Sequence, residues 1–428
     1  MKKHYLLAIT VLAFQGLTIA QTPCDAGRYS TELFPTVDVT TDINFGQNSN
    51  WDSSSEVLDL DFYEPSGDTE TKRPLIIWAH GGSFIGGTKT DPDVVELSNR
   101  FTKRGYVCAS IDYRVFFFPF DSVNAVKAVV RAVQDMKAAI RFFYKDAATD
   151  DFYGIDTNNI FIGGSSAGAI TALHTAYFDK ECEIENYMTV AELDALGGAE
   201  GTSGNPGYSS NVQGVINLCG ALASYGYIEA GDVPVCSLHG DNDLTVPYNR
   251  GIAEVSSIPI MYLDGSRMIH EQAAAVGVQS NLYTHYNTGH SPYFASASHM
   301  DTTVNFVRDF LVDILGCSET PLQVANIPSG IADFYTLTFC GLDINDAKIE
   351  LVDNPFPNPS ADQITINLKE NISVERIEIV DLSGRSVSIL DPSVSSHVIS
   401  KNTVGSGTYM LRVITTNGQT STSKIIFN

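Results

Sequence analysis

Ser166 stands in a setting that suggests nucleophilic chemistry. It lies between Gly164 and Gly168 in the sequence Gly-Ser-Ser-Ala-Gly, directly after the apolar run Ile160–Ile162. This pattern is typical of a strand that turns sharply into a helix and so lifts one serine hydroxyl above the edge of a sheet. A Cβ on either glycine would clash in such a tight turn. Ser166 is therefore the predicted nucleophile.

A serine hydroxyl is a weak nucleophile that needs a general base, and an acid must orient that base. The predicted base is His290, in the loop Asn287–Pro292 that follows a strand-like run. Two acids lie upstream of it, Asp241 and Asp243, where an apolar run ends in His-Gly-Asp-Asn-Asp. One of the two is expected to hold the imidazole, and the other to cap the turn through its side chain.

The other histidines near this region have structural explanations. His285 lies inside the strand-like run and is expected to pack or to face solvent, and His299 precedes a predicted helix over Thr302–Leu315. His80 begins the sequence His-Gly-Gly-Ser and His239 begins the sequence His-Gly-Asp-Asn-Asp. We expect each of them to stabilise the conformation of its own loop. The order of the motifs along the chain, and not the residue type alone, therefore selects His290.

Attack on a carbonyl also requires N–H donors for the developing oxyanion. The apolar run Pro74–Ala79 leads into His-Gly-Gly-Ser at positions 80–83. The glycines of this loop allow its backbone to approach a substrate carbonyl closely. We expect the N–H groups of Gly82, Ser83 and Ala167 to form the oxyanion hole.

Alternating strands and helices must position these residues, as a β-α-β architecture requires. Apolar residues recur at helical spacing from about Ser122 to Tyr144 and predict an amphipathic crossover helix. The Gly- and Ser-rich segment Glu181–Asn211 is expected to form a lid or rim over the site, or a surface loop. The aromatic run Val115–Phe120 either lines a pocket near the site or packs in the core.

Three stretches together resemble the α/β-hydrolase superfamily: His80–Phe84, Gly105–Arg114 and Gly164–Gly168. Within it, the resemblance is to secreted carboxylesterases and lipase-like acyl hydrolases, and it covers about Leu58 to Leu315. It implies an α/β fold with a mostly parallel central sheet flanked by helices. Many relatives have a third glycine at the position of Ser83, but a serine N–H can still donate, so the oxyanion role is expected to remain.

The resemblance also favours Asp243 over Asp241, since esterases place their acid at this position of the pattern His-Gly-x-x-Asp-x-x-Val-Pro. It implies a serine esterase that forms an acyl-enzyme, with Ser166, His290 and Asp243 as its triad and with no metal or organic cofactor. The alternatives are an esterase specific for a polymer (acylated or feruloylated polysaccharide, or a polyester), a serine peptidase, and an inactive hydrolase that serves as a binding protein.

The first 20 residues have two lysines, an apolar core and a small residue before Gln21, which predicts a secretory signal peptide. No later apolar run is long enough to cross a bilayer. The chain of 428 residues has 26 Lys and Arg against 50 Asp and Glu, a formal net charge of −24. Such acidity argues against nucleic acid and anionic membranes as partners.

The chain has seven cysteines, an odd number, so at least one thiol is free or paired between chains. An exported protein can form disulfides, but the pairing cannot be deduced from the sequence. The spacing of Cys and His residues predicts no zinc site.

After the predicted catalytic domain (21–318) and a linker (319–353), short alternating strands over 354–428 predict a small β-sandwich. The segments Asn354–Ser360, Val380–Arg385, Gly407–Tyr409 and Lys424–Asn428 resemble the type A C-terminal sorting domain of the type IX secretion system. The resemblance implies a Gram-negative protein that crosses the periplasm and the outer membrane, with the secretion machinery as its partner. The mature protein would be secreted or held at the cell surface.

Overall fold

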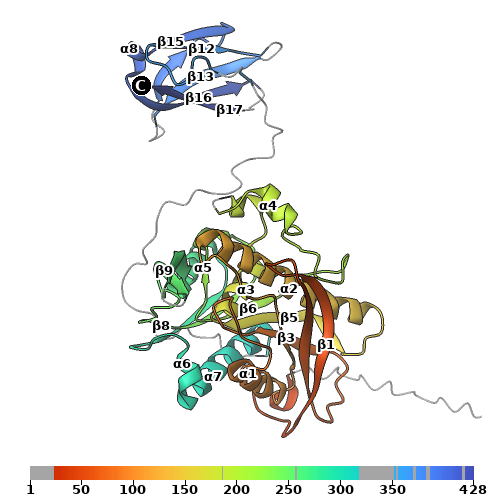
Figure 1. Cartoon of the computed structure of the whole chain (residues 1–428). Helices are drawn as coiled ribbons and strands as arrows, with labels where there is room; N and C mark the ends of the chain where they lie inside the picture. Colours follow the sequence, from red (N-terminus) through yellow and green to blue (C-terminus); the bar gives the residue numbers. More distant parts are fainter. Residues whose placement is uncertain are drawn as a thin grey trace, which may run out of the picture. The chain divides into compact units, whose positions relative to one another are not determined.

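The computed structural model describes residues 24–185, 187–255, 258–317, 351–352, 355–369, 373–381, 386–416 and 420–428. The chain divides into two compact units, Met1–Cys340 and Gly341–Asn428 (Figure 1). The signal peptide expected over residues 1–20 lies outside the described residues, as does nearly all of the linker expected over 319–353.

The first unit is built on an eight-stranded sheet in the order β1-β2-β4-β3-β5-β6-β8-β11. Strands β1, β2 and β4 pair antiparallel, and every pair from β4 to β11 is parallel. The strands are β1 (Val37–Ser49), β2 (Ser55–Pro65), β3 (Arg73–Ala79), β4 (Val107–Ile111), β5 (Ile155–Ser165), β6 (Gly214–Leu218), β8 (Val235–Gly240) and β11 (Ser280–His285). This confirms the predicted mostly parallel sheet.

Helices cover both faces of this sheet, so β3, β4, β6 and β8 are buried along their whole length. Figure 1 shows α1 (Pro92–Thr102), α6 (Pro292–Ala295) and α7 (Ala297–Ile314) on one face. The other face carries α2 (Ser122–Ala148), α3 (Ala167–Tyr177) and α5 (Ser266–Val276). Helix α7 begins earlier than predicted, so His299 lies inside it rather than before it.

A second, three-stranded antiparallel sheet stands beside the helices α2 and α3. It has the order β7-β10-β9 and consists of β7 (Ala221–Leu222), β9 (Arg250–Val255) and β10 (Ile258–Gly265). The sequence analysis did not foresee it. Short helical turns complete the unit: η1 (Asp25–Gly27), η2 (Glu181–Ile184), η3 (Tyr225–Tyr227) and α4 (Val190–Ala195).

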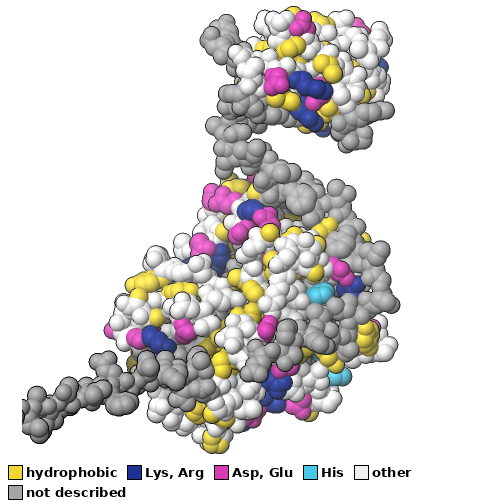
Figure 2. Space-filling view, turned by 180° about the vertical axis from the view of Figure 1, so that it is seen from behind, with side chains coloured by type: hydrophobic (Ala, Val, Ile, Leu, Met, Phe, Trp, Pro, Cys, Tyr) yellow, Lys and Arg dark blue, Asp and Glu magenta, His cyan; other side chains and the backbone are white. Residues whose placement is uncertain are grey.

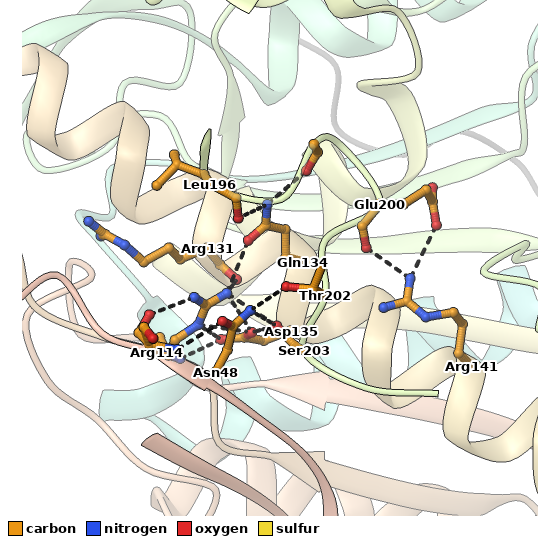
Figure 3. A network of polar contacts seen from close by, with 12 residues as sticks. Asn48, Arg114, Arg131, Gln134, Asp135, Arg141, Leu196, Glu200, Thr202 and Ser203 are labelled. Carbon is orange, nitrogen blue, oxygen red and sulfur yellow. Dashed lines mark hydrogen bonds and ion pairs between the residues drawn. The ribbon is translucent and has the colours of Figure 1, made fainter. Parts of the chain in front are cut away.

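A buried polar network ties three distant segments to α2 (Figure 3). The guanidinium of Arg114 pairs with Asp135 at 2.8 Å, and their side chains are 3% and 0% exposed. The hydroxyl of Ser203 donates to the same carboxylate at 2.6 Å, and Nη1 of Arg114 donates to Ser49 O at 2.8 Å. The side-chain amide of Gln134 donates to Leu196 O and Gly198 O. The network therefore fixes both the loop after β4 and residues 196–203 of the segment expected to be a lid, a rim or a surface loop.

The second unit consists of two antiparallel sheets around one apolar core. One sheet pairs β12 (Gln363–Asn367) with β15 (Ser396–Ser400), and the other has the order β14-β13-β16-β17. The remaining elements are β13 (Val374–Val380), β14 (Ser386–Leu390), β16 (Gly407–Thr415), β17 (Thr420–Phe427) and α8 (Lys401–Val404). Leu351 and Val352 pack in this core, so the unit begins before residue 354.

On the face drawn in Figure 2, most basic side chains lie beside acidic ones. Within the first unit, Arg100 contacts both Glu32 and Asp301 at 3.0 Å. None of the described helices combines the length and the hydrophobicity that a membrane span requires.

Candidate active site

Ser166 occupies the sharp turn between β5 and α3, with backbone angles φ 55° and ψ −115°. This is a strained conformation for a residue with a Cβ. Its N–H donates to Leu218 O at 2.8 Å, which helps to hold the turn. A Cβ on Gly164 would lie 2.4 Å from the backbone of Gly168, and one on Gly168 would lie 2.0 Å from Ala79 O. Because neighbouring backbone atoms lie so close, neither position has room for a side chain, as the sequence analysis expected.

The structure brings His290 and Asp243 together with Ser166. His290 Nε2 lies 2.7 Å from Ser166 Oγ, and His290 Nδ1 lies 2.6 Å from Asp243 Oδ2. Because a carboxylate only accepts hydrogen bonds, Nδ1 carries the proton and Nε2 is left to accept from the serine hydroxyl. The three side chains thus form one continuous chain of hydrogen bonds.

The carboxylate of Asp243 is buried and fully hydrogen-bonded. Its Oδ1 accepts from the N–H groups of Thr245 and Val246 at 2.8 and 3.0 Å, and its Oδ2 accepts from His239 as well as from His290. Burial alone would raise the pKa of Asp243, but the hydrogen bonds from His239 and His290 outweigh it and hold the pKa well below its usual range. The acid is therefore ionised at neutral pH.

His239 supports this carboxylate from within the protein. Its Nε2 lies 3.1 Å from two acceptors, Asp243 Oδ2 and Val246 O, so Nε2 carries the proton. Its Nδ1 lies 2.7 Å from Ser266 Oγ, which itself accepts from the amide of Asn217 at 2.9 Å. Both ring nitrogens of His239 therefore have hydrogen-bond partners. The sequence analysis gave it only a role in loop geometry.

The alternative residues lie in other surroundings. Asp241 Oδ1 accepts from the N–H of Asn287 at 2.6 Å and so joins two loops. His285 is buried on β11, where its ring packs edge-on against that of His299 with centroids 4.9 Å apart. Burial lowers the pKa of His285 to about 4, and the ring is therefore neutral at pH 7.

The loop expected to supply oxyanion donors lies directly beside Ser166. An added Cβ on Gly81 would be 3.5 Å from Ser166 Cβ. Gly82 has φ +113°, and Ser83 has φ +56°, a left-handed conformation that glycine adopts more easily. Ser83 therefore adopts the left-handed backbone conformation that a glycine at this position would adopt more easily. The loop is held by the hydroxyl of Tyr113, which donates to His80 O at 2.8 Å.

Ala167 is the first residue of α3, so its N–H has no acceptor within the helix. The positive end of the helix dipole lies at the same point, which favours negative charge there. Ser83, Ser166 and Ala167 all line one pocket.

This pocket has a volume of about 890 Å³, including its open mouth. Its walls come from the oxyanion loop, α2, α3, η2 and the hairpin β9–β10, and most of the lining side chains are apolar. Phe117, from the aromatic run, lines it, as do Ile184 and Tyr187 from the segment expected to be a lid or rim. The hairpin residues could not be assigned from the sequence, because Pro259 in β10 weakens its strand signal.

One group of possible metal ligands lies at the site. The ligand atoms of Cys219, Asp243 and His290 lie within 4.8 Å of one another. Burial raises the pKa of Cys219 to about 12, so its sulfur stays protonated and is a poor ligand. The other two side chains are bonded to each other. The arrangement suits proton transfer better than metal binding.

Comparisons with known proteins agree with this architecture. Residues 60–195 match the BD-FAE family model, and residues 354–428 match the model of the Secretion system C-terminal sorting domain. The chain is 30% identical over 183 residues to Carboxylesterase 3B of Mus musculus, covering 37% of this chain and 31% of that protein. It is 32% identical over 129 residues to the Quorum-quenching protein AidA of Acinetobacter baumannii, covering 30% and 38%.

The chain spans less than two fifths of the length of each of these relatives. Among solved structures, the apo form of Thermogutta terrifontis esterase 2 is similar, with 22% identity and a TM-score of 0.48 over 69% of this chain and 100% of that one. The chain carries a carboxylesterase-like α/β-hydrolase domain followed by a C-terminal secretion sorting domain.

Proposed function

We propose that the first unit is a serine carboxylic ester hydrolase with Ser166 as nucleophile, His290 as general base and Asp243 as the orienting acid. The observation that carries this proposal is the hydrogen-bonded chain from Ser166 Oγ through both nitrogens of His290 to Asp243 Oδ2. A serine that donates to an imidazole, itself held by an ionised acid, is activated for attack on a carbonyl carbon.

In the first half-reaction, Ser166 Oγ bonds to the ester carbonyl carbon while His290 Nε2 takes its proton. The N–H groups of Gly82, Ser83 and Ala167 stabilise the oxyanion that forms. The imidazolium, held by Asp243, then gives its proton to the leaving alkoxide, and the alcohol departs from the acyl-enzyme.

In the second half-reaction, water attacks the acyl carbon and gives its proton to His290 Nε2. The tetrahedral intermediate collapses, the carboxylic acid leaves, and the proton returns to Ser166 Oγ. The ionised state of Asp243 supports this role, because a charged carboxylate stabilises the imidazolium present in both halves.

The experiment is hydrolysis of p-nitrophenyl acetate by the wild-type chain and by Ser166→Ala. We expect the substitution to lower kcat by a factor on the order of 10⁴ or more. Matched pairs of variants test the partners: Asp243→Asn against Asp241→Asn, and His290→Ala against His285→Ala. In each pair the first variant should lose far more activity. Equal losses within a pair would contradict the assignment of that residue.

We further propose that the second unit directs export through the type IX secretion machinery, to the cell surface or the medium of a Gram-negative cell. The match of residues 354–428 to a secretion system sorting domain supports this destination. A chain truncated after Cys317 should stay inside a type IX-competent host, and the full chain should leave it. Equal export of both chains would contradict the proposal.

A further inference from the structure

The pocket beside Ser166 is elongated along α3. Ala167, Ile170, His174 and Phe178 all line it, and their spacing of three or four residues places them on one face of that helix. At a rise of 1.5 Å per residue, the wall from Ala167 to Phe178 is about 16 Å long. This wall is longer than an extended chain of ten carbons, which spans about 11 Å, so a chain of that length can lie along it from the nucleophile.

Two other elements close the pocket with branched or flexible apolar side chains. Helix α2 contributes four valines, Val126, Val129, Val130 and Val133, and the hairpin β9–β10 contributes Val255, Ile260, Met261 and Leu263. Met261 contacts the same apolar cluster as Val126, Val130 and Phe178, so the two walls meet around the far end of the pocket.

The polar groups at that far end are occupied by the protein itself. His174 Nδ1 lies 2.8 Å from Ile170 O, and His174 Nε2 accepts from the N–H of Ala223. The hydroxyl of Tyr187 donates to Ala223 O, and that of Tyr227 donates to Glu183 O. A polar group on a ligand would therefore have to displace one of these bonds or remain unpaired.

The remaining polar lining groups gather at the reacting end. Ser83 lies on the oxyanion loop beside Ser166, and the N–H of Thr245 donates to Asp243 Oδ1. Glu254 is exposed, and its N–H donates to Thr245 O at 3.2 Å. Polarity thus falls from the reacting end toward the far end of the pocket, as binding of a carbonyl group at one end and a hydrocarbon at the other requires.

We infer that this pocket binds an unsubstituted aliphatic acyl group of medium length, about eight to ten carbons, and discriminates against acyl groups with a hydroxyl at the far end, such as hydroxycinnamoyl groups. The inference rests on the proposed ester hydrolysis and names the substrate class of that site. Among the alternatives raised by the sequence, it disfavours a feruloylated polysaccharide as substrate.

The test compares kcat/KM for three p-nitrophenyl esters: acetate, octanoate and 8-hydroxyoctanoate. Octanoate should exceed acetate by about tenfold or more, because each buried methylene adds transition-state binding. The terminal hydroxyl should lower kcat/KM by about 10- to 100-fold relative to octanoate. A preference for acetate, or equal values for the two eight-carbon esters, overturns the inference.

A matched pair of variants on α2 tests the position of the acyl chain. Val130→Phe fills the pocket and should lower the ratio of octanoate to acetate activity by about tenfold, whereas Val123→Phe, at a position 43% exposed on the same helix, should leave this ratio unchanged. Met261→Phe makes the same test from the hairpin wall if Val130→Phe does not fold. An unchanged ratio in the folded pocket variant overturns the inference.

Failure of the inference differs from failure of the proposed function. Cleavage of acetate that depends on Ser166, without any preference for octanoate, would reject only the inferred acyl group. A folded chain that cleaves none of the esters, and whose Ser166 does not react with a fluorophosphonate probe, would reject the esterase itself and the inference with it.

Discussion

Helix α2 separates two buried regions of opposite character. Toward the pocket it presents valines, among them Val130 and Val133, which are 3% and 2% exposed. Toward the segment 196–205 it presents Gln134, Asp135 and Arg141, which form hydrogen bonds with Leu196, Ser203 and Glu200 (Figure 3). Both regions are buried, but the side chains that α2 contributes are apolar in the first and form hydrogen bonds and ion pairs in the second.

The difference reflects what each region must do. Directional bonds fix the loop of Arg114 and the segment of Ser203 in one arrangement, because each buried group requires its own partner. Apolar walls have no such requirement, so a hydrocarbon can occupy the space between them without replacing any bond. One helix therefore anchors the frame of the site on one side and forms a ligand-binding wall on the other.

The largest expected effect comes from removing one charge of the network. Asp135→Leu leaves the guanidinium of Arg114 buried without its partner and should lower the free energy of unfolding by about 3–5 kcal/mol in urea denaturation. The double variant Arg114→Met, Asp135→Leu removes both charges and should recover part of this loss. If the single variant were as stable as the wild type, the network would not be the anchor of these segments.

A smaller effect should follow from pH on the pocket side. Burial lowers the pKa of His174 to about 4, so between pH 6.5 and 4 the unfolded chain binds a proton that the folded chain does not. Stability should therefore fall as the pH falls through this window, by about 2 kcal/mol between pH 7 and pH 5 from this residue alone. Urea denaturation of His174→Gln should show a correspondingly weaker pH dependence. If the stability of the wild type and that of His174→Gln depended on pH in the same way, His174 would not be a buried neutral ring in the folded protein.

The smallest expected effect is a hydroxyl placed on the valine wall. Val133→Thr keeps the size of the side chain and should lower the free energy of unfolding by about 1 kcal/mol. Val123→Thr, at an exposed position of the same helix, should change it by only a few tenths of a kcal/mol. Thermal or urea unfolding measures both, and equal losses would mean that burial does not distinguish the two positions.

The sequence predicts the elements of the site better than its surroundings, for a physical reason. The turn at Ser166 depends on glycines two residues away, and the order of the strands places the loops of Asp243 and His290 at the same edge of the sheet. Local patterns of this kind can be recognised from the sequence alone. The structure links Ser166, His290 and Asp243 by hydrogen bonds, and the sequence analysis had named all three, with the choice of Asp243 over Asp241 resting on the resemblance to esterases.

The pocket and the network depend on long-range pairing and could not be predicted. Arg114 and Ser203 are 89 positions apart, and their meeting depends on how the intervening strands and helices pack. The same holds for the hairpin β9–β10, whose residues face α2 only after the chain has folded. The valines of α2 were correctly placed on a helix, but their periodicity cannot distinguish a closed core from a pocket wall.

The disulfide between Cys24 and Cys317 has a topological consequence. It joins residues 293 positions apart, one before β1 and the other just after α7, so the backbone of the catalytic unit becomes a covalent ring. In a chain-entropy model, closing a ring of this size lowers the conformational entropy of the unfolded chain, which stabilises the folded state by about 6 kcal/mol. Peptide cleavage beyond Cys317, including removal of the sorting domain, would leave the ring closed. A single cut inside it would open the loop but leave both fragments joined.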